Sequence, residues 1–218
     1  MKTGLLTGVL LCALGTGTAD AATLNPAGVP RTASAAAGFA PSGFRVEKEQ
    51  RADLSADGIP DLGIVLIERG AKRERRRGLV IAQGVRGGGY ERVGVSARLL
   101  ACTACGGAFW GLLPAPITLS VQRGALLVDQ TAGSRELIQT VHRLRIERNR
   151  RVRLIGLDSS RSDRNTGNGT RVSTNYLTGE VAIEFLVKSA VVKTGTATVS
   201  KVPHYLEALR VRDPLASL

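Results

Sequence analysis

The chain has 218 residues, of which 43% are hydrophobic and 22% are charged, and its formal net charge is +12. This length is enough to bury one ordinary hydrophobic core and hardly two, so a single domain is expected. Aromatic residues make up only 4% of the chain, which disfavours a nucleic-acid surface that depends on base stacking.

Residues 1–21 are typical of a cleavable signal peptide. Lys2 supplies the positive start, residues 5–14 form a short apolar run, and Ala19-Asp20-Ala21 gives the small-x-small cleavage pattern. The apolar run is shorter than the roughly 20 residues that a membrane-spanning helix needs, so no transmembrane span is expected after cleavage. We therefore predict that the mature protein is periplasmic or secreted.

The next segment, residues 22–42, consists mostly of Ala, Gly, Thr, Ser and Pro, with a single charge at Arg31. Such a composition has few large apolar groups to offset the entropy lost on ordering. The sequence therefore predicts a disordered lead-in over 22–42, followed by a single β-rich domain over 43–218.

Strand patterns recur at short intervals from residue 44 onward, and Gly, Asn, Asp and Pro punctuate nearly every gap. They cover 44–50, 62–69, 79–83, 90–100, 117–122, 126–130, 137–146, 152–157, 171–176 and 180–188. No long segment keeps a helical period, and residues 203–212 fit either a short helix or an edge strand. The sequence predicts an all-β fold, an antiparallel β-sandwich or open barrel built of hairpins, with at most one short C-terminal helix.

Two of the expected hairpins are well defined by their patterns. In 142–154, apolar residues alternate with arginines on both sides of a turn at residues 148–150, so one face is apolar and the other basic. In 170–185, Thr178-Gly179 supplies the reversal, because glycine readily adopts a positive φ.

Residues 53–61 form the most informative motif. They place oxygen-bearing side chains at alternate positions, and the expected ligands are the side chains of Asp53, Ser55, Asp57 and Asp61 with the backbone carbonyl of Ile59. Calcium takes six to eight oxygen ligands, and Gly58 supplies the sharp turn that wraps a short loop around one centre. Three carboxylates this close repel one another without a cation. The motif predicts a calcium site; the alternative is a hairpin turn whose aspartates are solvated and cap backbone amides.

The loop is not an EF-hand, because Ile64 stands where the bidentate Glu of that motif belongs. With strand patterns on both sides, it resembles the calcium loop of FG-GAP and VCBS-type repeats, whose pattern is Asp-x-Asn/Asp-x-Asp-Gly-x-x-Asp-Leu. The matching residues are Asp53, Asp57, Gly58, Asp61 and Leu62, while Ser55 replaces the usual Asn or Asp. The motif occurs once, whereas a propeller requires it at a fixed period.

The wider chain is similar to a family of exported bacterial proteins that carry one such loop near the N-terminus. The shared elements are Cys-x-x-Cys-Gly-Gly, here residues 102–107, and Asn-Tyr-x-Thr-Gly, here residues 175–179. The resemblance then covers residues 44–185. It implies export and a calcium loop, and it brings no biochemical activity with it.

Cys102 and Cys105 follow an apolar strand pattern and precede two glycines. In an exported chain, a short disulfide that closes this corner is the expected state. A redox-active pair is the alternative, although thioredoxin-like sites place Cys-x-x-Cys at the start of a helix. Structural zinc would need two more ligands, and the sequence has no second cysteine pair.

Positive charge is concentrated in two segments, which form the expected polyanion-binding residues: Lys72, Arg73, Arg75, Arg76, Arg77, Arg143, Arg145, Arg151 and Arg153. Such patches attract an anionic envelope surface or an acidic polysaccharide, and export makes nucleic acid the least favoured partner. The alternative is that these side chains are an ordinary solvated surface.

The sequence has no nucleophile elbow, no His-Glu-x-x-His and no phosphate-binding loop. It therefore favours an exported calcium-binding module with a binding or structural role. The competing functions are an envelope-polymer hydrolase and a polyanion-binding protein. A cleft that combines Asp or Glu with His142 or His204 would favour the hydrolase.

Overall fold

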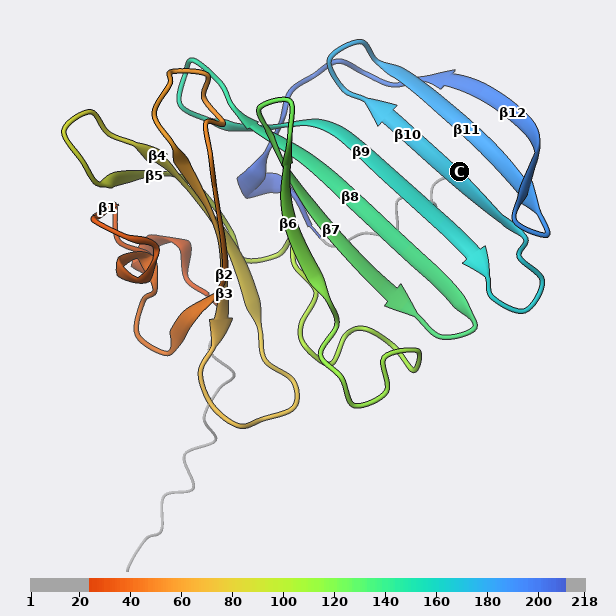
Figure 1. Cartoon of the computed structure of the whole chain (residues 1–218), viewed down its shortest axis with the longest axis horizontal. Helices are drawn as coiled ribbons and strands as arrows, with labels where there is room; N and C mark the ends of the chain where they lie inside the picture. The colour runs from red at the N-terminus through yellow and green to blue at the C-terminus, as the bar shows by residue number, and fades with distance from the viewer. Residues whose placement is uncertain (1–23, 211–218) are drawn as a thin grey trace, which may run out of the picture.

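Two antiparallel sheets make up the computed structural model, which describes residues 24–210 (Figure 1). The first sheet is five-stranded, in the order β1-β5-β4-β3-β2. The second is eight-stranded: β12, β11, β10, β9, β8, β7 and β6 follow one another, and β13 pairs with β9. This sheet curves into a half-barrel, and the prediction of an all-β fold is confirmed.

The five-stranded sheet contains β1 (Thr32–Ala33), β2 (Phe44–Ala52), β3 (Asp61–Glu68), β4 (Arg77–Gly84) and β5 (Tyr90–Ser96). The short 3-10 helices η1 (Pro26–Gly28) and η2 (Ala36–Phe39) flank β1. No helix within residues 24–210 is long and apolar enough to cross a membrane.

The eight-stranded sheet contains β6 (Ile117–Gln122), β7 (Ala125–Gly133), β8 (Glu136–Ile146), β9 (Val152–Asp163), β10 (Gly169–Asn175), β11 (Glu180–Val187), β12 (Ala190–Thr198) and β13 (His204–Tyr205). The 3-10 helix η3 (Leu206–Ala208) follows. The C-terminal segment thus contains both expected elements, a two-residue strand and a short helix.

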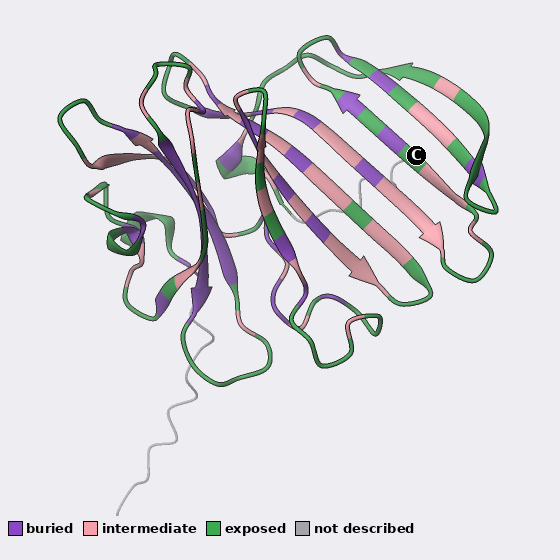
Figure 2. Ribbon diagram, in the orientation of Figure 1, coloured by how far each residue is buried: buried purple, intermediate pink, exposed green. Residues whose placement is uncertain are grey.

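Strand β3 is the centre of the molecule, because both of its faces are buried (Figure 2). Leu62, Ile64 and Leu66 belong to one core, whereas Val65 belongs to the core shared with the eight-stranded sheet. A strand buried on both faces needs a continuous apolar run instead of an alternating one. The run of apolar residues from 62 to 67 is therefore explained by the fold.

The N-terminal segment differs from the predicted disordered lead-in over 22–42. From residue 24 onward it packs on the five-stranded sheet, with Leu24, Val29, Ala36 and Phe39 at most 2% exposed. The guanidinium of Arg92 in β5 also donates to the carbonyl oxygens of Pro26 and Val29. A few large apolar side chains at the right spacing are enough to cover the outer face of β3 and β4, although the average composition is that of a linker.

Both hairpins defined by their sequence patterns form, with their turns where the patterns place them. In β8 and β9, Leu144 pairs with Leu154 and Ile146 with Val152, all buried, while Arg145 faces Arg153 on the opposite side. β10 and β11 pair through residues 169–175 and 180–186, and Gly179 takes a φ of 79° in the turn. The predicted signal peptide, residues 1–21, lies outside the described residues.

Candidate functional site

The predicted calcium loop connects β2 to β3 and forms the tip of that hairpin, closed by the pairing of Ala52 with Asp61. Leu54 anchors it, since this side chain is 2% exposed and its carbonyl accepts a hydrogen bond from the amide of Ile146 at 3.1 Å. The loop therefore lies against the turn between β8 and β9. Its position on a hairpin, between two strands, is as predicted.

Asp61 is fully buried at the base of the loop. One carboxylate oxygen accepts the amides of Leu54 at 2.8 Å and Ser55 at 2.9 Å, and the other accepts the amide of Gly84 in β4 at 2.8 Å. Burial raises the pKa of Asp61 above its usual value, and these hydrogen bonds offset part of that rise. The carboxylate thus ties the hairpin tip to the neighbouring strand, at the cost of holding a charge in a poorly solvated position.

Asp53 and Asp57 lie at the open side of the loop. Asp53 accepts the amides of Asp57 at 3.2 Å and Gly58 at 2.9 Å. Asp57 accepts the amide of Ile59 at 2.8 Å and the side-chain amide of Gln83 at 3.0 Å, and these two bonds lower the pKa of Asp57. Both side chains are therefore held in place by hydrogen bonds.

The backbone of the loop is turned to make these contacts possible. Gly58 has a φ of 82°, as expected for the sharp turn, and Ala56 has a φ of 61°, a conformation that costs a residue with a side chain about 1–2 kcal/mol. Ser55 lies near the acidic groups: its hydroxyl donates to Asp53 at 3.4 Å, and its proximity also acts to lower the pKa values of Asp57 and Asp61. Ser55 is thus the side chain that lies near all three predicted acidic ligands.

The carboxylate oxygens of Asp53, Asp57 and Asp61 are not close enough to one another to hold one ion as they stand. Within residues 24–210, the group of three acidic or cysteine ligands whose atoms lie within 4.8 Å of one another is Glu74 with Cys102 and Cys105, not the loop. A calcium ion would therefore have to draw Asp53 and Asp57 closer to Asp61. In this part of the chain no Lys or Arg forms a salt bridge with any of the three aspartates.

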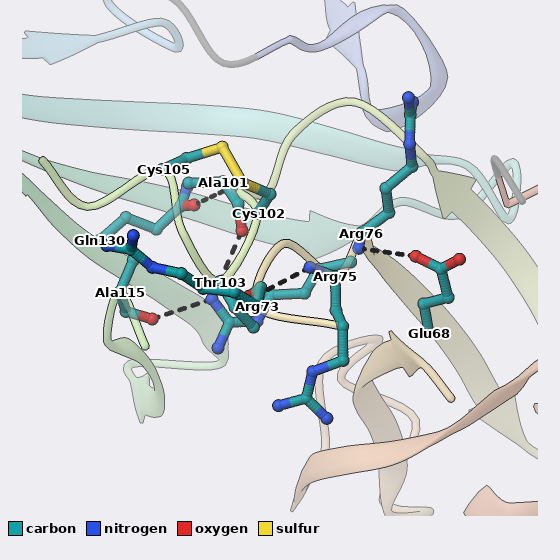
Figure 3. Close-up of a disulfide and its surroundings, with 11 residues drawn as sticks. Glu68, Arg73, Arg75, Arg76, Ala101, Cys102, Thr103, Cys105, Ala115 and Gln130 are labelled. Carbon is teal, nitrogen blue, oxygen red and sulfur yellow. Dashed lines mark hydrogen bonds between the residues drawn. A yellow bond between two sulfur atoms is a disulfide. The ribbon is translucent and has the colours of Figure 1, made fainter. Parts of the chain in front are cut away.

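Cys102 and Cys105 are at disulfide distance, with their sulfur atoms 2.03 Å apart (Figure 3). The corner is held by Thr103, whose hydroxyl accepts the amide of Arg75 at 2.9 Å and donates to the carbonyl of Arg73 at 2.5 Å. Gln130 in β7 accepts the amide of Ala101 at 2.8 Å. Thr103, inside the short loop that the cysteine pair closes, therefore fastens the long connection between β5 and β6 to the turn between β3 and β4.

The predicted basic residues divide into those with side-chain partners and those without. Arg77 is a structural residue: it is 3% exposed and makes two 2.6 Å bonds to Glu47, the extra residue at the β-bulge of β2. The other engaged side chains pair as Lys72 with Glu68, Arg73 with the carbonyl of Gly111, Arg143 with Asp158, Arg151 with the ring of Tyr205, and Arg153 with Glu147. Arg75, Arg76 and Arg145 have no side-chain partner among the described residues.

The structure does not join the two basic segments into one surface. Residues 72–77 belong to the end of the turn between β3 and β4 and to the start of β4. The turn between β8 and β9 instead lies at the other end of β3, beside the predicted calcium loop of residues 53–61, which we also term the acidic loop (Figure 1). Each segment would therefore have to bind an anionic partner by itself.

Among residues 24–210, neither histidine lines one of the four pockets on the surface. His142 is 8% exposed on the buried face of β8, and His204 in β13 packs edge-on against Tyr176 at 5.1 Å. Four pockets on the described surface have carboxylates, arginines or glycines in their walls, and none of the four includes a histidine. The condition that would favour a hydrolase is therefore not met at these pockets.

Comparison with protein-family models, with curated proteins and with solved structures finds no match to this chain. The function must therefore be argued from the residues and their geometry. Two features were not foreseen from the sequence: Gln83 and Gly84 of β4, which contact the acidic loop only because the sheet places them there.

Proposed function

We propose that the protein is an exported, calcium-stabilised β-rich module with a binding or structural role. The calcium ligands are the side chains of Asp53, Ser55, Asp57 and Asp61, with the backbone carbonyl of Ile59. The observation that carries the proposal is a charge imbalance: three carboxylates lie within one nine-residue loop of a chain with 30 basic residues, and none forms a salt bridge among the described residues, with Arg86 acting on Asp57 only through a longer-range charge interaction.

A divalent cation would resolve this imbalance. The buried carboxylate of Asp61 has its pKa raised by desolvation, and a nearby positive charge favours the ionised form. The ion would also fix a loop that already contacts β4 through Gly84 and β8 through Ile146. Calcium would thereby join the β2–β3 hairpin to β4 and β8 at one end of the molecule, which is a stabilising role and not a catalytic one.

The proposal predicts a calcium-dependent gain in thermal stability. At a calcium concentration a hundredfold above the dissociation constant, binding adds about 2.7 kcal/mol to the free energy of unfolding. For a domain of this size that corresponds to a rise in Tm of roughly 5–10 °C. The measurement compares melting of the purified mature protein in millimolar calcium and in excess chelator.

Two variants make this experiment specific. Asp57→Ala removes a proposed ligand and should abolish the calcium-dependent gain. Asp163→Ala is the matched control, because Asp163 also caps backbone amides in a hairpin turn, but its carboxylate forms a salt bridge with Arg135 at 2.8 Å. This control should lose some stability and keep the full calcium increment. An identical Tm with and without chelator in the parent protein would refute calcium binding.

Binding to an anionic envelope surface is a second candidate function, favoured by the unpaired side chains of Arg75 and Arg76. Arg75 lines a pocket of about 370 Å³ together with Lys72 and Arg73, and Arg76 is the next residue along the chain. Attraction of this kind weakens as salt screens the charges. Cosedimentation with anionic phospholipid vesicles should therefore fall with rising salt and with the double substitution Arg75→Ala/Arg76→Ala, whereas Arg145→Ala should leave it unchanged.

A further inference from the structure

The solvent-facing side of the eight-stranded sheet carries an ordered set of polar side chains, which we term the polar face. Pairing across β8, β9, β10 and β11 aligns two rows on this side, Val141-Asp158-Ser173-Ala182 and Gln139-Ser160-Arg171-Glu184. The opposite side of β8 and β9 packs in the core through Leu144 and Leu154. The polar face is thus separate from the calcium loop and from the core.

The side chains of the polar face hold one another in place. Asp158 accepts hydrogen bonds from Arg143 and, at 2.7 Å, from the hydroxyl of Ser173. Gln139 donates to both oxygens of Asp129 at 3.0 Å. A Cβ at Gly156 would lie 3.3 Å from the Arg143 side chain, so the glycine gives this arginine room to lie across the sheet. These contacts reduce the entropy that a ligand would have to remove on binding.

A pocket of about 390 Å³ lies on this face and is lined by residues of both rows. Its ionisable groups are Arg143, Asp158, Arg171 and Glu184, two cations and two anions, so their formal charges cancel. In a chain with a net charge of +12, this balance is local and distinguishes the polar face from the exposed arginines described above. An anion has no electrostatic reason to prefer this pocket.

We infer that the pocket on the polar face binds a neutral carbohydrate. Hydroxyl groups of a sugar both donate and accept hydrogen bonds, and the pocket offers carboxylates, guanidinium groups, serine hydroxyls and an amide within one surface. No aromatic ring lines the pocket, so recognition rests on hydrogen bonds to hydroxyl groups and the affinity is low. The inference does not depend on calcium binding.

The test is affinity gel electrophoresis of the whole mature protein in gels that contain dextran, mannan or galactan. The protein should be retarded by at least one neutral polymer, and the retardation should persist when salt is raised. The double variant Arg171→Ala/Glu184→Ala keeps the net charge and should remove the retardation. Its matched control is Arg51→Ala/Glu49→Ala, an ion pair of similar side-chain exposure on the other sheet, which should be retarded like the parent protein.

A gel that contains alginate, an anionic polymer, is run alongside. Three results would overturn the inference: no retardation in any of the neutral polymers, equal retardation of both double variants, or retardation only in alginate that disappears when salt is raised. The last result would instead assign the binding to the exposed arginines. Release of the retarded protein by the free monosaccharide would show that one sugar unit is sufficient. Retardation that only the polymer can compete would show that a longer chain is recognised. Because no step involves calcium, the experiment is performed in chelator and its outcome is separate from that of the proposed function.

Discussion

His142 makes the stability of the protein depend on pH in a defined window. The imidazole is 8% exposed on the buried face of β8, and its Nδ1 has no hydrogen-bond partner among the described residues. Burial lowers the pKa of His142 to about 4, although its contact with the backbone of Val128 acts in the opposite direction. The folded protein therefore holds this histidine neutral, while the unfolded chain protonates it near pH 6.5.

The sign follows from proton binding in the two states. Between pH 6.5 and about 4 the unfolded chain binds a proton that the folded chain does not, so the free energy of unfolding falls as the pH falls. A pKa difference of this size corresponds to about 3 kcal/mol, lost once the pH is below 4. Asp57 and Asp163, whose pKa values are lowered, add their losses only below their ordinary value of 3.8.

Urea unfolding of the parent protein and of His142→Leu at pH 7, 5.5 and 4.5 measures this effect. The leucine variant places an apolar side chain between the cross-strand partners Val128 and Leu157 and removes the titrating group, so its stability should change less between pH 7 and 4.5. NMR titration of the imidazole should give a pKa near 4 in the folded state. Parallel pH profiles for the two proteins, or an imidazole that titrates near 6.5, would refute the reasoning.

Three further substitutions test other parts of the structure. Glu47→Ala leaves Arg77 buried without its carboxylate and should cost about 3–5 kcal/mol in urea unfolding; a loss below 1 kcal/mol, as at an exposed pair, would contradict the buried bridge. Phe39→Ala should cost about 3–5 kcal/mol and expose the N-terminal segment to protease; unchanged cleavage would show that this segment does not depend on Phe39. Gly58→Ala should cost roughly 1–2 kcal/mol and weaken calcium binding. Gly43→Ala, with the same φ of 82° and open space around it, should cost as much and leave calcium binding intact.

Local periodicity was sufficient to predict much of the eight-stranded sheet. The hairpin of β8 and β9 alternates apolar residues and arginines, and its register follows from that pattern because one face must be buried. Strand β12 was missed. Eight of its nine residues are exposed, and it is held mainly by backbone pairing with β11, so its sequence has no alternation to detect.

For the N-terminal segment, the sequence predicts too little structure for a different reason. Its average composition predicts disorder, yet Phe39 and Leu24 are buried because an apolar sheet face elsewhere in the chain needs a cover. That requirement is tertiary and leaves no local signal. The acidic loop was found from its spacing alone, whereas the contacts of Gln83 and Gly84 with it depend on the register of β3 and β4.

The most direct test of the central claim is an NMR titration of the calcium-free protein with calcium. A calcium site in this loop should give saturable shifts, with one dissociation constant in the range of about 10⁻⁴ to 10⁻³ M typical of extracellular calcium modules. The shifts should be largest at the amides of Gly58, Ile59 and Gly84, which donate to the acidic side chains, and magnesium should not reproduce them. The chemical shifts of the amides in the turn after Asp163 should not change when calcium is added. Shifts that do not saturate, or that occur equally at both turns, would contradict a calcium site in this loop.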